Sequence, residues 1–333
     1  MVRTRAAVAI CVIWGCAAGA PDLTLPEKLI AAGHWKQART LVEARIREAP
    51  DDALANFLLS QVRNAFGDRE SPLSLAEKAV ALDGNTAKYH RQVAEVIGVM
   101  AQHAGLFQQL GLARRFRKEI DTAVALDPRD LQALRDLMEF YLLAPGIAGG
   151  DSHKAETVAE RIAGISPADG FLARSRLAGY RKRATDAEAF LRSAVEAQPA
   201  YYNARIQLAQ FYLADGHLNL AAAEQNACEA RKIDPGRVDA YSILASVYAA
   251  RAQWNELEST LTSVLQEVPD DRTPYFRATE RLLASGRDLP RAERYLRIYL
   301  DQPPEGNQPT AGDARSKLDV ILQREGRAAE SSK

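Results

Sequence analysis

The chain has 333 residues, and its 43 Lys and Arg residues balance its 43 Asp and Glu residues, which excludes a protein held to nucleic acid mainly by its overall charge. With 20 Gly and 15 Pro the chain is neither fibrous nor disordered, and its three Cys cannot make a disulfide-stapled scaffold of this length.

The first 20 residues have the pattern of an export signal. Arg3 and Arg5 form a basic start, the apolar stretch 6–14 is too short to cross a bilayer as a transmembrane helix, and small residues follow. The alternative is a buried first helix, but the stretch has no amphipathic period. We therefore expect a bacterial, exported protein with a signal over residues 1–20 and a location in the periplasm.

The end of this signal can be interpreted in two ways. Residues 13–16, Ile-Trp-Gly-Cys, resemble a bacterial lipobox, which would make 1–15 the signal and Cys16 a lipidated N-terminus anchored in the outer membrane. Trp14 departs from the small residue that is usual at its position. The other ending is cleavage between Ala17 and Ala20. In both cases Cys228 is the thiol that remains, and we interpret it as a small buried side chain.

The rest of the chain repeats a helical unit. Helical stretches end at Pro or Gly residues whose spacings are 34, 44, 39, 32, 36, 34 and 34 residues, namely Pro50, Gly84, Pro128, Pro167, Pro199, Pro235, Pro269 and Pro303. Apolar residues at helical spacing give each helix one buried stripe, and Pro cannot continue a helix, so each unit ends in a turn. A period of 34 residues predicts a helix–turn–helix solenoid.

The clearest unit spans residues 238–269. Its first helix carries Tyr241, Leu244, Ala245 and Tyr248, and its second carries Leu257, Leu261 and Val264. These positions resemble the tetratricopeptide repeat (TPR) pattern, and about eight such units cover 24–303. The resemblance implies an all-α, right-handed TPR-type helix-turn-helix solenoid without a sheet. A polar capping helix over 310–326 and a flexible tail over 327–333 would follow the repeats.

Two units exceed the period. The third carries ten extra residues near 99–111, whose composition predicts longer helices, and the fourth carries five extra residues in a Gly-rich loop over 144–151 that Asp151 or Ser152 ends as a helix cap. That loop is no phosphate-binding loop, because Asp151 stands where Lys and Ser or Thr are needed. We also predict caps at Ser71 and Thr273, each before a Pro, and a capping box over 185–188.

No catalytic residue, cofactor site or metal ligand stands out. The five histidines have no metal-ligand spacing, and Cys228 has no Cys at redox or metal spacing. The basic cluster over 174–183 is interpreted as a solvated face balanced by Asp186 and Glu188. The repeats leave no stretch of about 100 residues for a catalytic domain, which argues against an enzyme.

The resemblance implies a groove formed by the first helices of successive units. Counting from each repeat start, its positions would be Asn56, Phe57, Gln61, Lys88, Arg91, Glu95, Arg135, Glu139, Asn203, Gln210, Ser242 and Ser246. They are mixed and polar, and the two-carboxylate clamp of chaperone-binding TPRs is not reproduced. We expect a non-catalytic scaffold of the bacterial cell envelope that binds a protein or peptide, not nucleic acid. The alternatives are a self-associating structural protein and an enzyme whose site is not recognisable from sequence.

Overall fold

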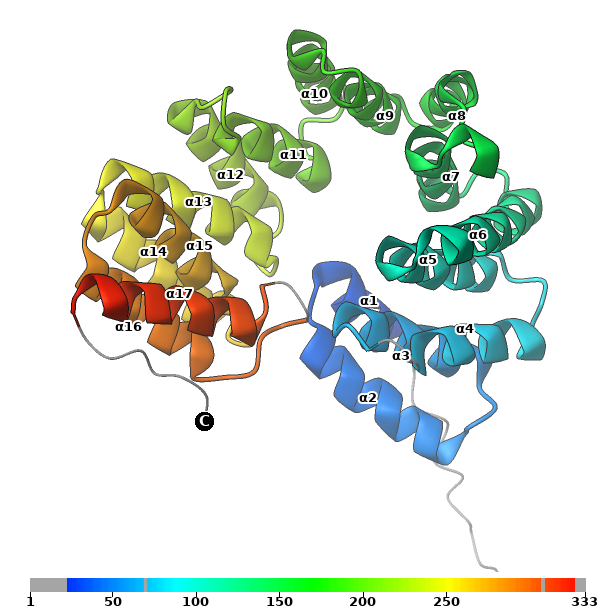
Figure 1. The fold of residues 1–333 in the computed structure, drawn as a ribbon, viewed down its shortest axis with the longest axis horizontal. Helices are drawn as coiled ribbons and strands as arrows, with labels where there is room; N and C mark the ends of the chain where they lie inside the picture. Colours follow the sequence, from blue (N-terminus) through cyan, green and yellow to red (C-terminus); the bar gives the residue numbers. More distant parts are fainter. Residues whose placement is uncertain (1–22, 69–70, 307–308, 327–333) are drawn as a thin grey trace, which may run out of the picture.

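The structure is a computed structural model that describes residues 23–68, 71–306 and 309–326. Within these ranges it contains seventeen α-helices, one short 3₁₀ helix and no β-strand, which confirms the predicted all-α class (Figure 1). The helices are, in chain order, α1 (Thr24–Ala32), α2 (Trp35–Glu48), α3 (Ala53–Ala65), α4 (Ser71–Leu82), α5 (Ala87–His103), α6 (Leu106–Leu126), α7 (Leu131–Leu143), η1 (Gly146–Ala148), α8 (Ser152–Ile165), α9 (Pro167–Tyr180), α10 (Ala184–Ala197), α11 (Tyr202–Leu213), α12 (Leu220–Ile233), α13 (Val238–Arg251), α14 (Trp254–Glu267), α15 (Thr273–Ser285), α16 (Leu289–Leu300) and α17 (Ala311–Arg324).

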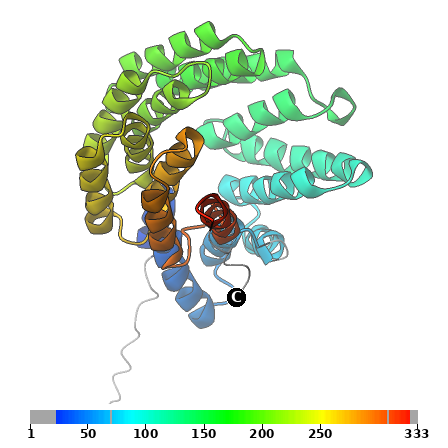
Figure 2. The same ribbon diagram turned by 60° about the vertical axis from the view of Figure 1, so that its left-hand side comes forward.

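The helices stack in pairs, and the stack curves until its two ends meet. In Figure 1 the first pair, α1 and α2, lies beside the last helices of the chain, and the turned view of Figure 2 shows the same neighbourhood. Helices α5 and α7 lie on the inside of the curve, while α6 and α8 lie on the outside. The solenoid is therefore a ring, closed by a contact between its N-terminal and C-terminal repeats.

The predicted apolar stripes form the core of this ring. Ala209 and Ala245, the small residues expected at close helix contacts, are both completely buried, as is Leu257. A helix pair cannot bury its own apolar face alone, so stability comes from stacking on the next pair. The last helix, α17, buries Leu318, Ile321 and Leu322 against the preceding repeat and leaves Val320 exposed.

Both irregular units have the predicted local structure. The third pair has the longest helices, α5 with 17 residues and α6 with 21 residues, so its extra length is helical. The fourth unit has a loop over 144–151, and the Asp151 side chain accepts hydrogen bonds from the backbone of His153 and Lys154 as the N-cap of α8. Gly149 has a φ of 102°, and a Cβ on Gly150 would lie 1.7 Å from the carbonyl oxygen of Ala144. The glycines are thus required by a turn.

Three predicted caps differ from the structure. Residues 185–188 form no capping box, because α10 already begins at Ala184 after Arg183 and has no side-chain cap. Thr273 is the first residue of α15 and does not cap it; its backbone N–H is bonded by the Asp271 side chain. Ser71 likewise lies inside α4 and bonds to Asp68. A Pro at the second helical position tolerates this shift, because its missing N–H would have no helical partner there.

Candidate functional site

The twelve expected groove positions all lie on the first helices of their pairs. Asn56, Phe57 and Gln61 are on α3, and Asn56 and Phe57 are buried there. The Asn56 amide donates to the carbonyls of Pro50 and Asp52, and the Phe57 ring lies against that of Tyr89. Gln61 is half-buried. Asn56 and Phe57 therefore stabilise the local fold and are not free to line a groove.

Six of these positions make polar contacts between repeats. Five contact the adjacent repeat, and these contacts join Glu95 to Asn64 (3.3 Å), Arg91 to Asp136 (3.7 Å), Arg135 to Asp169 (3.0 Å), Glu139 to Arg176 (2.5 Å) and Asn203 to Arg237 (3.1 Å). The sixth, Lys88 of α5, reaches past α3 to Glu27 of α1 (2.7 Å). We call this set the inter-repeat ladder. Its side chains already have partners within the chain, so a ligand would have to replace those contacts.

The remaining three positions meet at one cavity. Gln210 of α11 and Ser242 and Ser246 of α13 line a space of about 740 Å³ between the inner helices and the N-terminal pair. We call it the central cavity. Its N-terminal wall is formed by the end of α1 and the start of α2, including Ile30, Gly33 and Trp35. Helices far apart in the sequence thus line one site, which is partly open to solvent.

The opposite wall of the central cavity is charged. The side chains that sequence reasoning missed there are Arg237, Asp239, Asp271, Arg277, Glu280, Arg281 and Glu305. Arg277 pairs with Glu280 at 2.8 Å, and Glu280 also pairs with Lys317 at 3.5 Å. Arg281 donates to the carbonyl oxygen of Leu213 at 3.0 Å and has no carboxylate partner among the described residues. Arg281 therefore adds to this wall a positive charge that no described carboxylate pairs with.

Three polar atoms of the cavity lining are buried without a hydrogen-bond partner in the described part of the chain. They are the hydroxyl oxygen of Ser242, Nε of Arg237 and Oε2 of Glu305. The Arg237 guanidinium stacks on the Tyr202 ring, 3.9 Å from its centroid, and lies 3.3 Å from the Asp239 carboxylate. An unpaired buried donor costs free energy, so a ligand that supplies an acceptor there would gain affinity.

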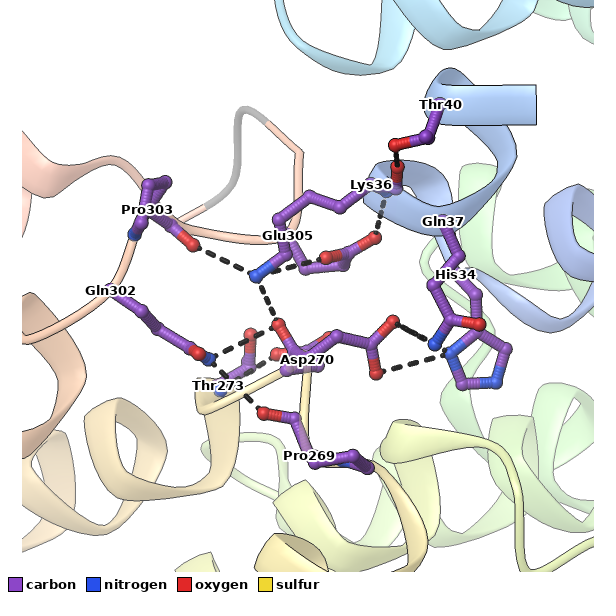
Figure 3. Close-up of polar contacts among 11 residues, drawn as sticks. His34, Lys36, Gln37, Thr40, Pro269, Asp270, Thr273, Gln302, Pro303 and Glu305 are labelled. Carbon is purple, nitrogen blue, oxygen red and sulfur yellow. Dashed lines mark hydrogen bonds and ion pairs between the residues drawn. The ribbon is translucent and has the colours of Figure 1, made fainter. Parts of the chain in front are cut away.

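One side of the cavity is held by a polar junction between the ends of the ring (Figure 3). His34 Nδ1 lies 3.1 Å from the Asp270 carboxylate, and the Gln37 amide donates to the same carboxylate at 2.8 Å. The backbone N–H of Lys36 donates to Glu305 at 2.6 Å, and its ammonium lies 3.2 Å from that carboxylate. We call these five residues the clasp. No local sequence signal marks them, because they come from opposite ends of the chain.

Three side chains of the clasp have pKa values shifted from their ordinary values. The hydrogen bond with Asp270 is the main cause that raises the pKa of His34 above its ordinary value. Burial raises the pKa of Glu305 to about 7, because Lys36 offsets only part of the desolvation of its carboxylate. Burial would also raise the pKa of Asp270, but the bonds from His34 and Gln37 keep it below its usual range.

The four arginines of the basic cluster over 174–183 form ion pairs within the chain. Arg174 pairs with Glu160 at 2.8 Å, Arg176 with Glu139 at 2.5 Å, and Arg181 with Glu156. Of the two acids expected to balance it, Asp186 does pair with Arg183, whereas Glu188 pairs with Arg192. The interpretation as a balanced face agrees with these contacts, although most partners come from α7 and α8.

The remaining expectations concern a reactive thiol, a metal site and membrane attachment. Cys228 is half-buried on α12, and burial raises the pKa of its thiol, which makes it a poor nucleophile. In the described ranges no three His, Cys, Asp or Glu side chains gather as metal ligands. None of the described helices is both long and apolar enough for a membrane span. The export signal and Cys16 lie outside the described residues.

Solved structures with a similar fold are TPR proteins. No family model and no curated protein sequence matches the chain. A thermophilic TPR protein from Thermus thermophilus superposes with a TM-score of 0.51 at 21% identity, covering 58% of this chain and 97% of that one. A TPR protein from Parabacteroides merdae (TM-score 0.43, 12% identity, 90% and 97% covered) and yeast Tom70 (0.45, 11%, 90% and 79%) are also similar. The fold is that of a TPR-type solenoid, as the repeat pattern predicts.

Proposed function

We propose that this protein is a non-catalytic scaffold that binds a segment of a partner protein in its central cavity. The observation that carries the proposal is the cavity itself, where three expected groove residues meet an arginine without a carboxylate partner and three buried polar atoms without hydrogen-bond partners among the described residues. Its volume of about 740 Å³ is in the range of specific ligand sites and suits a few residues of an extended chain.

The chemistry of the lining favours a segment with a carboxylate and hydrogen-bonding groups. Arg281 supplies a positive charge, while Ser242 and Gln210 supply hydroxyl and amide groups. Ile30 and Trp35 offer apolar contact from the opposite wall. Each carboxylate of the cavity is engaged through at least one oxygen by an Arg or Lys side chain or by a backbone N–H group, which supports a binding role.

The test is affinity capture from a bacterial envelope extract with the full chain and two charge reversals. Arg281→Glu removes the free positive charge of the cavity, and Arg129→Glu makes the same change on an exposed turn. We expect a protein that co-purifies with the wild type and with Arg129→Glu and is lost with Arg281→Glu. A partner retained equally by both variants would show that the cavity is not the binding site.

We also propose that the protein is exported to the bacterial periplasm and anchored at the outer membrane through lipidated Cys16. Support comes from the basic start, the short apolar stretch and the lipobox-like residues 13–16. More than one buried acyl chain anchors a protein stably, where a single chain binds only marginally.

The anchor is tested by expressing the full chain and Cys16→Ser in a Gram-negative host, followed by fractionation and N-terminal mass analysis. A membrane-bound wild type that begins with acylated Cys16 supports the proposal, provided that Cys16→Ser releases the protein. A soluble periplasmic wild type with an unmodified N-terminus beyond Cys16 would refute the anchor and leave simple secretion.

A further inference from the structure

The junction that closes the ring is polar, whereas the rest of the ring is held by apolar contacts. Among the described residues, the apolar cluster of the first repeats includes residues 23–89, and that of the last repeats includes residues 171–322. No buried apolar cluster contains described residues from both ends. Contacts between parts of a chain that are small and polar allow relative motion, while large apolar ones do not.

The two ends of a solenoid can move apart without any helix pair unfolding. Each helix pair contacts only its neighbours, so small changes in the angle between successive pairs add up along the chain. The first and the eighth helix pair are seven pairs apart along the chain, and the chain segments beside them meet at the clasp. Releasing the clasp would therefore separate the ends while every pair keeps its own core.

His34 has the surroundings of a protonated histidine. Its Nδ1 lies 3.1 Å from the Asp270 carboxylate, and this carboxylate is the side-chain partner of the ring within the clasp. A hydrogen bond to a carboxylate and its negative charge both favour the imidazolium over the neutral ring. Losing this proton removes the positive charge that pairs with Asp270.

Glu305 is a buried acid whose carboxylate is incompletely hydrogen-bonded. Its side chain is 1% exposed, and its Oε2 has no hydrogen-bond partner in the described chain, although Lys36 lies near it. A buried carboxylate with incomplete hydrogen bonding is more easily accommodated when protonated. Ionisation of Glu305 therefore weakens the closed junction.

We propose that the clasp is a pH-governed latch, closed in mildly acidic solution and released as the pH rises above neutral, which controls access to the central cavity. The control of access rests on the proposed function, because it assumes that a partner segment enters there. The opening itself does not, since it is a property of this chain alone.

Three of the four titratable groups around the clasp that have a shifted pKa favour closure in acid. Those that face it are Lys36 of α2, Asp270 and Asp271 before α15, Glu305, Arg237 and Asp239 at the start of α13, Arg277, Glu280 and Arg281 of α15, and the pair of Arg272 and Asp301. The pKa of His34, Glu305 and Asp271 is raised in the closed ring, so their contribution to closure is present in acid and is lost as the pH rises. The pKa of Asp270 is lowered, so its contribution is lost only in stronger acid.

The size of the effect follows from Glu305. A pKa of about 7 in the closed clasp against the ordinary 4.5 corresponds to a change of roughly two orders of magnitude in the ratio of closed to open molecules across that interval. This holds where opening exposes Glu305 fully to water.

The first experiment measures small-angle X-ray scattering and amide hydrogen exchange of the full chain at pH 5.5 and 8.5, with circular dichroism to verify that the helices persist. The exchange data are corrected for the intrinsic effect of pH. We expect a larger radius of gyration and faster corrected exchange over residues 34–37 at pH 8.5. Glu305→Gln, which cannot ionise, should stay compact at pH 8.5, and His34→Gln should open at a lower pH than the wild type.

The matched control is His90→Gln. Like His34, His90 contacts a carboxylate through Nδ1, here Glu119 at 2.7 Å, and its Nε2 lies 3.1 Å from the carbonyl oxygen of Gly84; these contacts join neighbouring elements and not the ends of the ring. This variant should scatter like the wild type at both pH values. Equal dimensions of the wild type at pH 5.5 and 8.5, or an equal response of His90→Gln and His34→Gln, would overturn the latch.

Access to the cavity is tested without any partner. Ser246→Cys places a thiol in the cavity lining, and its reaction with a polymer-linked maleimide is followed by peptide mapping at pH 8.5. We expect reaction several times slower when Glu305→Gln is added, because that change keeps the ring closed. Equal rates would overturn the control of access, and failure to find a partner protein would concern only the proposed function.

Discussion

Ala245 and Ser246 are adjacent on α13 but have different surroundings. Ala245 is completely buried between helices, whereas Ser246 lines the central cavity and donates to the carbonyl oxygen of Ser242 at 2.9 Å. The same added volume should therefore have different effects at the two positions.

We expect Ala245→Leu to lower the free energy of unfolding by about 1–3 kcal/mol, because the core has no room for a larger side chain. Ser246→Leu can extend into the cavity and should cost less, about 0.5 kcal/mol. Urea denaturation of both variants measures the difference. Equal shifts of the two midpoints would show that the assignment of core and cavity faces on α13 is incorrect.

Asp136 is a half-buried acid on α7 within the inter-repeat ladder, and its Oδ2 is buried. Burial raises its pKa to about 7, because Arg91, 3.7 Å away, compensates only part of the desolvation and Oδ2 has no hydrogen-bond partner in the described chain. The folded protein thus binds this proton more tightly than the unfolded chain. Its contribution to stability is present below the ordinary pKa of 3.8 and is lost as the pH rises through about 7.

We expect Asp136→Asn to be less sensitive to pH than the wild type and to gain about 1 kcal/mol relative to it at pH 8. Urea midpoints at pH 6 and pH 8 measure this change. Asp121→Asn is the control, because Asp121 is a solvent-accessible acid that pairs with Arg117 on the surface. A wild type and an Asp136→Asn variant with the same pH dependence would contradict the prediction.

At the scale of elements, α9 shows how closely two helices of neighbouring pairs can approach. A Cβ on Gly170 would lie 2.4 Å from the Cβ of Ala163 on α8, while a Cβ on Gly179 of the same helix would meet nothing within 4 Å. Gly170 is therefore required by the contact between α8 and α9. Gly179 has no such requirement and only adds conformational entropy to the unfolded chain.

We expect Gly170→Ala to lower the free energy of unfolding by about 1–3 kcal/mol through overpacking. Gly179→Ala should instead raise it by up to about 1 kcal/mol, because Ala is the better helix former. Thermal unfolding of the two variants gives shifts of opposite sign. A stabilising effect of Gly170→Ala would mean that the two helices are further apart than in this structure.

On the scale of the whole molecule, the apolar core is divided among successive repeats. Leu58 belongs to the cluster of the first repeats and Leu257 to that of the last repeats, and both are almost completely buried. In solenoids, stability is close to a sum of terms within repeats and between neighbours. A local loss should therefore remain local.

We expect Leu257→Ala, which costs about 2–5 kcal/mol, to accelerate amide exchange in α13–α16 and leave α3 and α4 unchanged. Leu58→Ala should have the reverse pattern. Hydrogen exchange followed by mass spectrometry measures both variants. Uniform acceleration along the chain in either variant would show that the ring unfolds as one cooperative unit.

The sequence by itself determined the features that depend on neighbouring residues. Apolar spacing and the 34-residue period predicted the helix–turn–helix solenoid, the long third pair and the Gly-rich turn that Asp151 caps, because helix faces, turns and caps are set by residues within about one turn. The sequence predicted some helix starts incorrectly. Helix α10 begins at Ala184, before the predicted capping box, because Ala184 is already helical.

Only the tertiary structure decided how the ring closes and what surrounds the expected groove residues. Lys88, Arg135 and other positions are used between repeats, and His34 meets Asp270 across 236 residues of sequence. Closure depends on small angles between helix pairs that add along the whole solenoid, and no local pattern specifies their sum. The central cavity and its clasp therefore exist only once all the pairs have stacked.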